Sequence, residues 1–172
     1  RGGNHGAFKN PSKRDLPYKR PIWIYVGRVA VEKNIKAFLD LDLEGTKLII
    51  GKGPDLDNLK KKFTNDIFLG ERTNGELASH FASSDVFVFP SKTDTFGIVV
   101  LESLACGTPV AAYPVPGPKD ILGGTKIDTL DEDLKASALK ALKVSRQDCL
   151  EFSKKYSWEE TARIFFDNIS PN

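Results

Sequence analysis

The chain has 172 residues, of which 40% are hydrophobic and 28% charged, and this composition predicts one soluble domain with a core. A formal charge of +2 gives no argument for a nucleic-acid partner, and no apolar run approaches the ~20 residues of a membrane span. The first residues lack the apolar region of a signal peptide, and Cys106 and Cys149 have no metal-ligand spacing, which favours a reducing, cytoplasmic compartment and no metal site.

Residues 1–21 have the composition of an interdomain linker. They carry six Lys or Arg, a single Asp, and Gly or Pro at positions 2, 3, 6, 11, 17 and 21. A solvated tether is one interpretation, and a basic arm that touches anionic lipid or nucleic acid is the other. Because the chain begins with Arg1 and contains no Met, we expect it to be a piece of a longer protein whose N-terminal domain is missing.

From residue 22 onward, predicted strands alternate with predicted helices. Short apolar runs predict strands at 22–26, 47–50, 67–69, 86–89 and 110–113. Helical spacing predicts helices over 32–41, 54–63 and 75–82, one after Phe96, a short turn after Gly117, and a helical tail over 130–169. Strands without polar alternation are covered on both faces. The pattern therefore predicts an α/β fold with a doubly wound, Rossmann-like parallel sheet of six or so strands.

Two faces of the tail are interpreted as core. Leu134, Ala138 and Leu142 share one helix face, and the aromatic and apolar residues from Trp158 to Ile169 form another. His80, on the helix predicted over 75–82, has no Cys or carboxylate at ligand spacing and is interpreted as structural.

Doubly wound sheets bind ligands beyond the carboxyl ends of the strands, where the strand order reverses. For the order 3-2-1-4-5-6 this point lies between the first and fourth strands. Arg28 and Lys33 follow the first strand and Asp94 follows the fourth, so we expect the three to face one crevice. Two cations there would neutralise a diphosphate without a metal ion, although each cation alone would be interpreted as a surface charge.

The stretch after the fourth strand predicts a buried helix that begins beside Phe96 and Gly97. Thr93, Asp94 and Thr95 are the expected N-cap side chains, and the free N–H groups of the first turn would bind an anion. Glu102 follows Asp94 by eight positions, which suits an extended ligand with polar ends. The alternative stays open that Asp94 is only a cap and Glu102 only a charge at the helix edge.

Asp94, seven further residues, Glu102, and then Ser-Leu-Ala-Cys-Gly-Thr-Pro-Val resemble the signature of retaining glycosyltransferases of family four, which have the GT-B architecture. The resemblance implies that Asp94 and the backbone of Thr95, Phe96, Gly97 and Ile98 hold the donor sugar and diphosphate, and that Glu102 holds the ribose. Gly27, Arg28 and Lys33 match the Gly-Arg…Glu-Lys motif of that family, whose cations neutralise the leaving diphosphate. The usual first acidic residue is Glu, one methylene longer than Asp94.

The loops after the second and third strands complete the predicted site. A Gly-x-Gly turn at 51–53 resembles dinucleotide binding, but Leu56 stands where that fingerprint needs Gly or Ala, which argues against an oxidoreductase. The family resemblance implies instead that Gly53 lets the backbone approach the nucleotide-sugar. It also implies that Glu71 and Arg72 contact the base.

Taken together, the resemblance implies that residues 22–172 are the C-terminal, donor-binding domain of a hexosyltransferase. Such an enzyme moves a hexosyl group from a nucleoside diphosphate sugar to a lipid or saccharide acceptor with retention, and needs no cofactor. The acceptor site and any peripheral membrane contact would belong to the missing N-terminal domain, so the isolated domain would turn over little. The alternative is a non-catalytic, nucleotide-binding or response-regulator-like module, which favours acidic residues where this chain has Arg28.

Overall fold

The computed structural model describes residues 16–93 and 97–155. The predicted linker up to residue 15, the residues Asp94, Thr95 and Phe96, and the aromatic face from Trp158 to Ile169 lie outside the described residues. No helix within the described ranges is long and apolar enough to cross a membrane.

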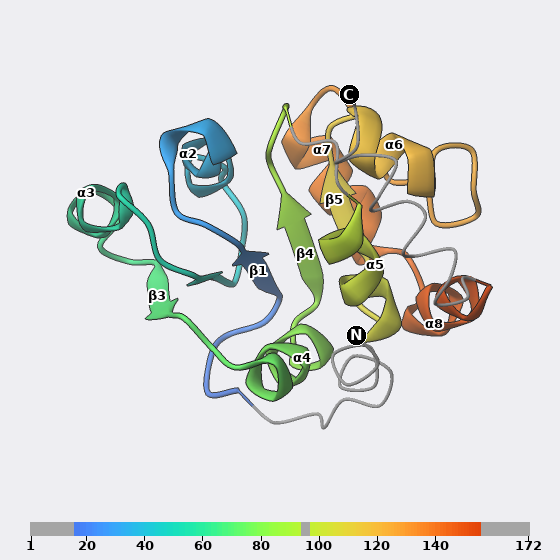
Figure 1. Ribbon diagram of the computed structural model, residues 1–172, viewed down its shortest axis with the longest axis horizontal. Coiled ribbons are helices and arrows are strands. Elements are labelled where there is room, and N and C mark those ends of the chain that lie inside the picture. The colour runs from blue at the N-terminus through green and yellow to red at the C-terminus, as the bar shows by residue number, and fades with distance from the viewer. Residues whose placement is uncertain (1–15, 94–96, 156–172) are drawn as a thin grey trace, which may run out of the picture.

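Five parallel strands form one sheet in the order β3-β2-β1-β4-β5, which confirms the predicted α/β fold (Figure 1). A sixth strand is not found among the described residues. The central strands β1 and β4 pair directly, with Trp23 opposite Val86, so the order does reverse between them. The strand bounds are β1 Ile22–Val26, β2 Thr46–Ile50, β3 Ile67–Gly70, β4 Val86–Phe89 and β5 Val110–Ala112.

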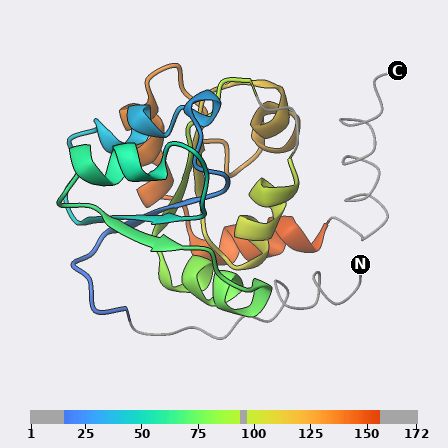
Figure 2. The ribbon, with the colours of Figure 1, turned by 60° about the vertical axis from the view of Figure 1, so that its left-hand side comes forward.

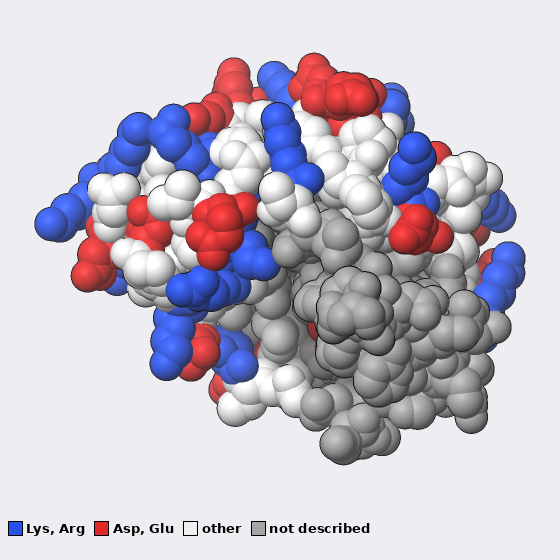
Figure 3. All heavy atoms as spheres, turned by 45° about the horizontal axis from the view of Figure 1, so that its top comes forward, with Lys and Arg blue, Asp and Glu red and all other residues white. Residues whose placement is uncertain are grey.

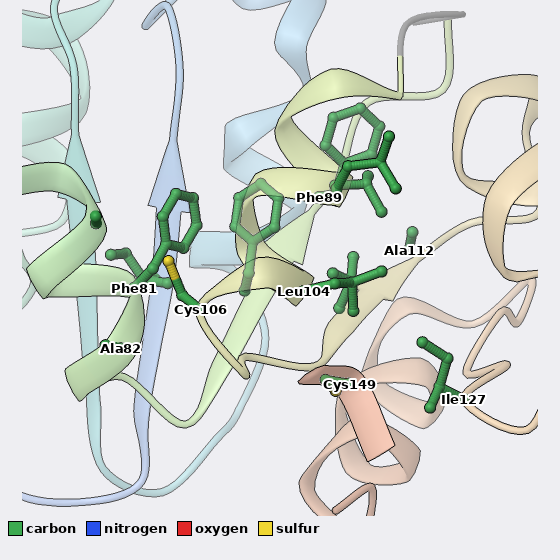
Figure 4. Packing of buried hydrophobic residues seen from close by; sticks show 14 of the residues in the cluster. Phe81, Ala82, Phe89, Leu104, Cys106, Ala112, Ile127 and Cys149 are labelled. Atoms are coloured by element: carbon green, nitrogen blue, oxygen red, sulfur yellow. The ribbon is translucent and has the colours of Figure 1, made fainter. Parts of the chain in front are cut away.

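Helices cover both faces of the sheet because successive residues of each strand point to opposite sides (Figure 2). Ile22 and Ile24 of β1 pack with α4, α5 and α8, whereas Trp23 and Tyr25 pack with α2, α3 and α7. Figure 4 shows side chains of the first of these two layers, among them Phe81 of α4, Leu104 of α5, Cys149 of α8 and Phe89 of β4. The helix bounds are α2 Ile35–Leu39, α3 Leu56–Lys62, α4 Asn74–Ser83, α5 Ile98–Ala105, α6 Pro116–Leu122, α7 Leu134–Leu142 and α8 Arg146–Lys154.

Local sequence signals account for several helix starts. The side chain of Thr73 accepts a hydrogen bond from the backbone N–H of Glu76, and the Glu76 carboxylate accepts one from the backbone N–H of Thr73, so α4 begins with a capping box. Asp133 and Ser145 are the N-caps of α7 and α8, and their side chains accept hydrogen bonds from backbone N–H groups of the first turn.

Three local predictions need correction. The single helix expected over 32–41 is a 3₁₀ turn, η1 (Val31–Lys33), followed by α2, because Asn34 between them is left-handed. Gly97, not Thr93, Asp94 or Thr95, occupies the N-cap of α5. Leu142 is exposed, because the buried positions of α7 step through 134, 137, 138 and 141, which places Ala141 in the core instead.

Candidate functional site

A crevice opens beyond the carboxyl ends of β1, β2, β3 and β4. It consists of two hollows that share Val26, Gly27 and Arg28 at the end of β1. The larger hollow, of about 790 Å³, extends over β2 and β3, and the smaller, of about 360 Å³, lies between β1 and β4. The arrowhead of β4 points to this end in Figure 1, and Figure 3 brings it forward. There Lys and Arg, with Asp and Glu between them, spread over the side that carries α2 and α3.

The smaller hollow brings together five of the residues singled out in the sequence, namely Gly27, Arg28, Lys33, Ile98 and Glu102. Arg28 and Lys33 come from the segment after β1, and Glu102 comes from α5. Ser91, which follows β4, and Ile98, at the start of α5, complete the opposite wall. The topology therefore places two cations and one carboxyl group around a single cavity at the point where the strand order reverses.

Arg28 stands at the boundary of the two hollows with its side chain 58% exposed. Its Nη1 lies 3.0 Å from Oε2 of Glu32, an exposed pair that a phosphate can replace at little cost. The backbone carbonyl of Arg28 accepts a hydrogen bond of 2.8 Å from the hydroxyl of Tyr25. Tyr25 therefore fixes the loop at Arg28. The sequence analysis did not single out Tyr25, although a tyrosine one residue before the end of a buried strand needs a partner for its hydroxyl group.

Glu102 is half-buried on the face of α5 that also carries Ile98 and Val99. Burial raises the pKa of its carboxyl group to about 7. Because α5 begins at Ile98, Glu102 lies ~6 Å along the helix axis from the first turn, at 1.5 Å per residue. A carboxyl group with this pKa exchanges its proton near neutral pH and can hydrogen-bond a pair of hydroxyls.

The larger hollow depends on a contact between two loops. The backbone N–H of Val29 donates to the carbonyl of Lys52, and the N–H of Asp55 donates to the carbonyl of Val29, both at 3.0 Å. A Cβ on Gly53 would lie 2.2 Å from the carbonyl oxygen of Val29. The close approach that requires glycine at position 53 is thus the one between the loops after β1 and β2.

Glu71 and Arg72 lie at the rim of the larger hollow, next to the end of β3. Nη1 of Arg72 donates to the carbonyl oxygens of Leu69, at 2.5 Å, and of Glu71, at 2.9 Å. The carboxylate of Glu71 lies 3.5 Å from Nζ of Lys52, a residue that the sequence analysis did not select although it stands between two glycines at a strand end. A flat base could lie against this rim and the apolar side chains of Leu56 and Leu77.

Gly97 is the N-cap of α5, and the side where a Cβ would stand faces another helix. A Cβ at this position would lie 2.3 Å from Cδ1 of Ile121 in α6, so the glycine allows the two helices to pack. Asp94, Thr95 and Phe96 lie outside the described residues, and their predicted roles stay predictions.

The remaining candidates for chemistry lie away from the crevice. Within residues 16–93 and 97–155, no group of three His, Cys, Asp or Glu side chains could hold a metal ion. Cys106 and Cys149 are free and buried, and burial raises the pKa of each thiol to about 12. His80 is buried on α4, and its Nδ1 lies 2.7 Å from the carbonyl oxygen of Glu76, which fits the structural interpretation.

Comparison with known proteins gives one family. A family model described as "Glycosyl transferases group 1" matches residues 7–155. The sulfoquinovosyl transferase SQD2 of Arabidopsis thaliana is 40% identical over 109 residues, which cover 60% of this chain and 21% of that protein. A GDP-mannose-dependent alpha-mannosyltransferase of Mycobacterium tuberculosis is 38% identical over 112 residues, covering 64% of this chain and 30% of that protein.

Solved structures agree on the fold. TarM of S. aureus, in a complex that includes UDP, superposes with a TM-score of 0.69 at 21% identity, over 92% of this chain and 36% of that one. The chain thus spans between about a fifth and a third of the length of the two relatives named above.

Proposed function

This chain belongs to the group 1 glycosyl transferases, and we propose that residues 22–172 are the donor-binding domain of a longer enzyme in that group. The proposed reaction is transfer of a hexosyl group from a nucleoside diphosphate sugar to an acceptor, with retention of configuration. One observation carries the proposal: Arg28, Lys33 and Glu102 line one cavity at the reversal of the strand order.

The two hollows suit an elongated ligand that passes over the end of β1. We propose that the diphosphate lies beside Arg28 and Lys33 at the start of α5, close to the backbone of Gly27, Gly97 and Ile98. The ribose then reaches Glu102. The base extends past Gly53 toward Glu71 and Arg72 in the larger hollow, which continues from the smaller one through Arg28.

The proposed catalysis consists of stabilising the negative charge of the leaving diphosphate. When the bond between the sugar and the diphosphate breaks, negative charge grows on the departing phosphate oxygen, and fixed cations and backbone N–H groups stabilise it. Arg28 and Lys33 would supply that stabilisation. Asp94, with the backbone of Thr95 and Phe96, would hold the sugar while the acceptor oxygen bonds to the sugar carbon that the diphosphate leaves. The proton of the acceptor hydroxyl would pass to the departing phosphate oxygen.

The partners of this domain are part of the same proposal. The chain spans only a minor part of each named relative. The proposed acceptor is a lipid or a saccharide, and an N-terminal domain elsewhere in the whole protein would bind it. We propose that this protein acts in the cytoplasm or at the inner face of the membrane and uses no cofactor. The named relatives leave both a GDP-sugar and a UDP-sugar as donor candidates.

Calorimetric titration of the chain with UDP-, GDP- and ADP-sugars tests the proposal. We expect saturable binding of one nucleotide class, with the matching nucleoside diphosphate retaining most of the affinity. The response-regulator-like alternative predicts that the chain binds none of the three nucleoside diphosphate sugars. That result would refute the donor-binding function.

A further inference from the structure

Asn34 joins η1 to α2 directly after Lys33. With φ 60° and ψ 31°, it is the one non-glycine residue with a positive φ in the described parts of the chain. Asparagine tolerates this left-handed conformation better than most residues, and glycine tolerates it fully. The backbone alone would therefore accept glycine here, so a role for asparagine has to come from its side chain.

The side-chain amide of Asn34 contacts two other loops. Nδ2 donates a hydrogen bond of 3.0 Å to the carbonyl oxygen of Pro90, which follows β4. The Asn34 amide also lies near the hydroxyl of Tyr113, which follows β5. Burial raises the pKa of this phenol, and the neighbouring Asn34 amide opposes the rise.

These contacts join the carboxyl ends of three strands at one wall of the smaller hollow. Lys33, Pro90 and Ser91 all line that hollow, and Asn34 holds the first of these loops against the second. Tyr113 is further held by Lys92, whose Nζ lies 4.8 Å from the centre of the phenol ring. The hydrogen bond from Asn34 to Pro90 thus ties the two loops together at the wall of the hollow between Lys33 and Ser91.

We propose that Asn34 is a positioning residue for nucleotide binding: its amide fixes the loop that carries Lys33 relative to the loop after β4, so that the Lys33 ammonium meets the diphosphate. The inference rests on the proposed donor-binding function. Asn34 itself touches neither phosphate nor sugar in this account. Its effect on affinity passes through Lys33.

Asn34→Gly is the direct test, because glycine keeps the left-handed backbone and removes the amide that donates to Pro90. We expect nucleoside diphosphate binding to weaken by ~5- to 20-fold, the effect of losing a hydrogen bond that orders the site. Because the loop that carries Lys33 then loses its tie to the loop after β4, Lys33→Ala should cost at least ~10-fold in the wild-type background but less than ~3-fold in the Asn34→Gly background.

Two further variants separate positioning from folding. Tyr113→Phe removes the hydroxyl beside the amide and keeps the ring under Lys92, so it should weaken binding less than Asn34→Gly and be non-additive with it. Asn58→Gly is the matched control: Asn58 donates to Asp55 at 3.2 Å on the exposed side of α3. This control should lower the midpoint of thermal unfolding and leave affinity unchanged.

UDP and GDP are titrated by calorimetry well below the unfolding midpoint of each variant. A lower midpoint in Asn34→Gly with unchanged affinity and an unchanged Lys33→Ala penalty would overturn the positioning role and leave the donor-binding function standing. If Asn34→Gly does not fold, Asn34→Asp takes its place, because aspartate keeps the shape of the side chain but not the N–H donor to Pro90, and full affinity in that variant overturns the role. If the wild-type chain binds neither nucleotide, both the proposed function and this inference fall.

Discussion

Arg28 and Glu102 line the same hollow, although Arg28 follows the first strand of the sheet and Glu102 lies in the helix after the fourth. Their meeting follows from the strand order, because β1 and β4 are direct neighbours and their carboxyl ends share one edge. A cation and a carboxyl group of raised pKa on opposite sides of a cleft suit a ligand that has both anionic and hydroxyl groups.

The two cations are expected to grip the diphosphate. Arg28→Ala or Lys33→Ala removes a charge-assisted contact worth ~1.5–3 kcal/mol, which corresponds to ~10- to 150-fold in affinity for the nucleoside diphosphate. Lys61→Ala, an exposed cation on α3, is the matched control and should leave the affinity unchanged. Isothermal calorimetry measures all three, and unaltered dissociation constants in both cleft variants would place the diphosphate elsewhere.

Gly53 is expected to be essential for the shape of the larger hollow. In Gly53→Ala the new Cβ meets the backbone of Val29, which cannot yield as a flexible side chain can, so we expect a loss of ~1–3 kcal/mol in unfolding free energy and weaker nucleotide binding. Gly75→Ala is the control, because a Cβ there has nothing within 4 Å. Gly75 lies in α4, where alanine in place of glycine raises the unfolding free energy by up to ~1 kcal/mol. Urea unfolding of both variants gives the comparison, and equal stability of Gly53→Ala and wild type would contradict the loop contact.

Much of this architecture could be predicted from the sequence, because buried strands such as 22–26 and 86–89 are short apolar runs bounded by polar loops. The position of the cleft followed from the usual strand order of doubly wound sheets, which the structure has between β1 and β4. The break at Asn34 could not be predicted, since the helical spacing of Ile35 and Phe38 does not mark where the helix begins and asparagine adopts left-handed and right-handed conformations alike. The need for glycine at positions 53 and 97 could not be predicted either. Their close neighbours are Val29 and Ile121, which only the tertiary fold brings near.

The raised pKa of Glu102 predicts a dependence of stability on pH. A carboxyl group whose pKa rises from 4.5 to about 7 on folding binds more protons in the native state, so the unfolding free energy falls as pH rises through that window and is level above it. The full effect is about 3 kcal/mol at most. Glu102→Gln lacks this titration, so the stability of wild type relative to the Gln variant should decline between pH 4.5 and pH 7. A constant difference across that range would mean that the carboxyl group is not desolvated.

Binding without a metal ion is a further expectation. The proposed clamp uses the side chains of Arg28 and Lys33 with backbone N–H groups, so affinity for the nucleoside diphosphate should be the same in EDTA and in added Mg²⁺ or Mn²⁺. Calorimetry in the two buffers measures it. Loss of binding on chelation would show that a cation bridges the phosphates and would replace the proposed clamp.

The central claim is that Glu102 holds the ribose and Asp94 the sugar, and calorimetric titration of two variants with two ligands tests it most directly. Glu102→Gln should weaken the nucleoside diphosphate and the nucleoside diphosphate sugar alike, whereas Asp94→Asn should weaken only the sugar-bearing ligand. Gly97 occupies the N-cap of α5, so an Asp94 side chain that makes no contact with the sugar predicts no change in either affinity. Equal losses for both ligands in Asp94→Asn, or none, would contradict the assignment.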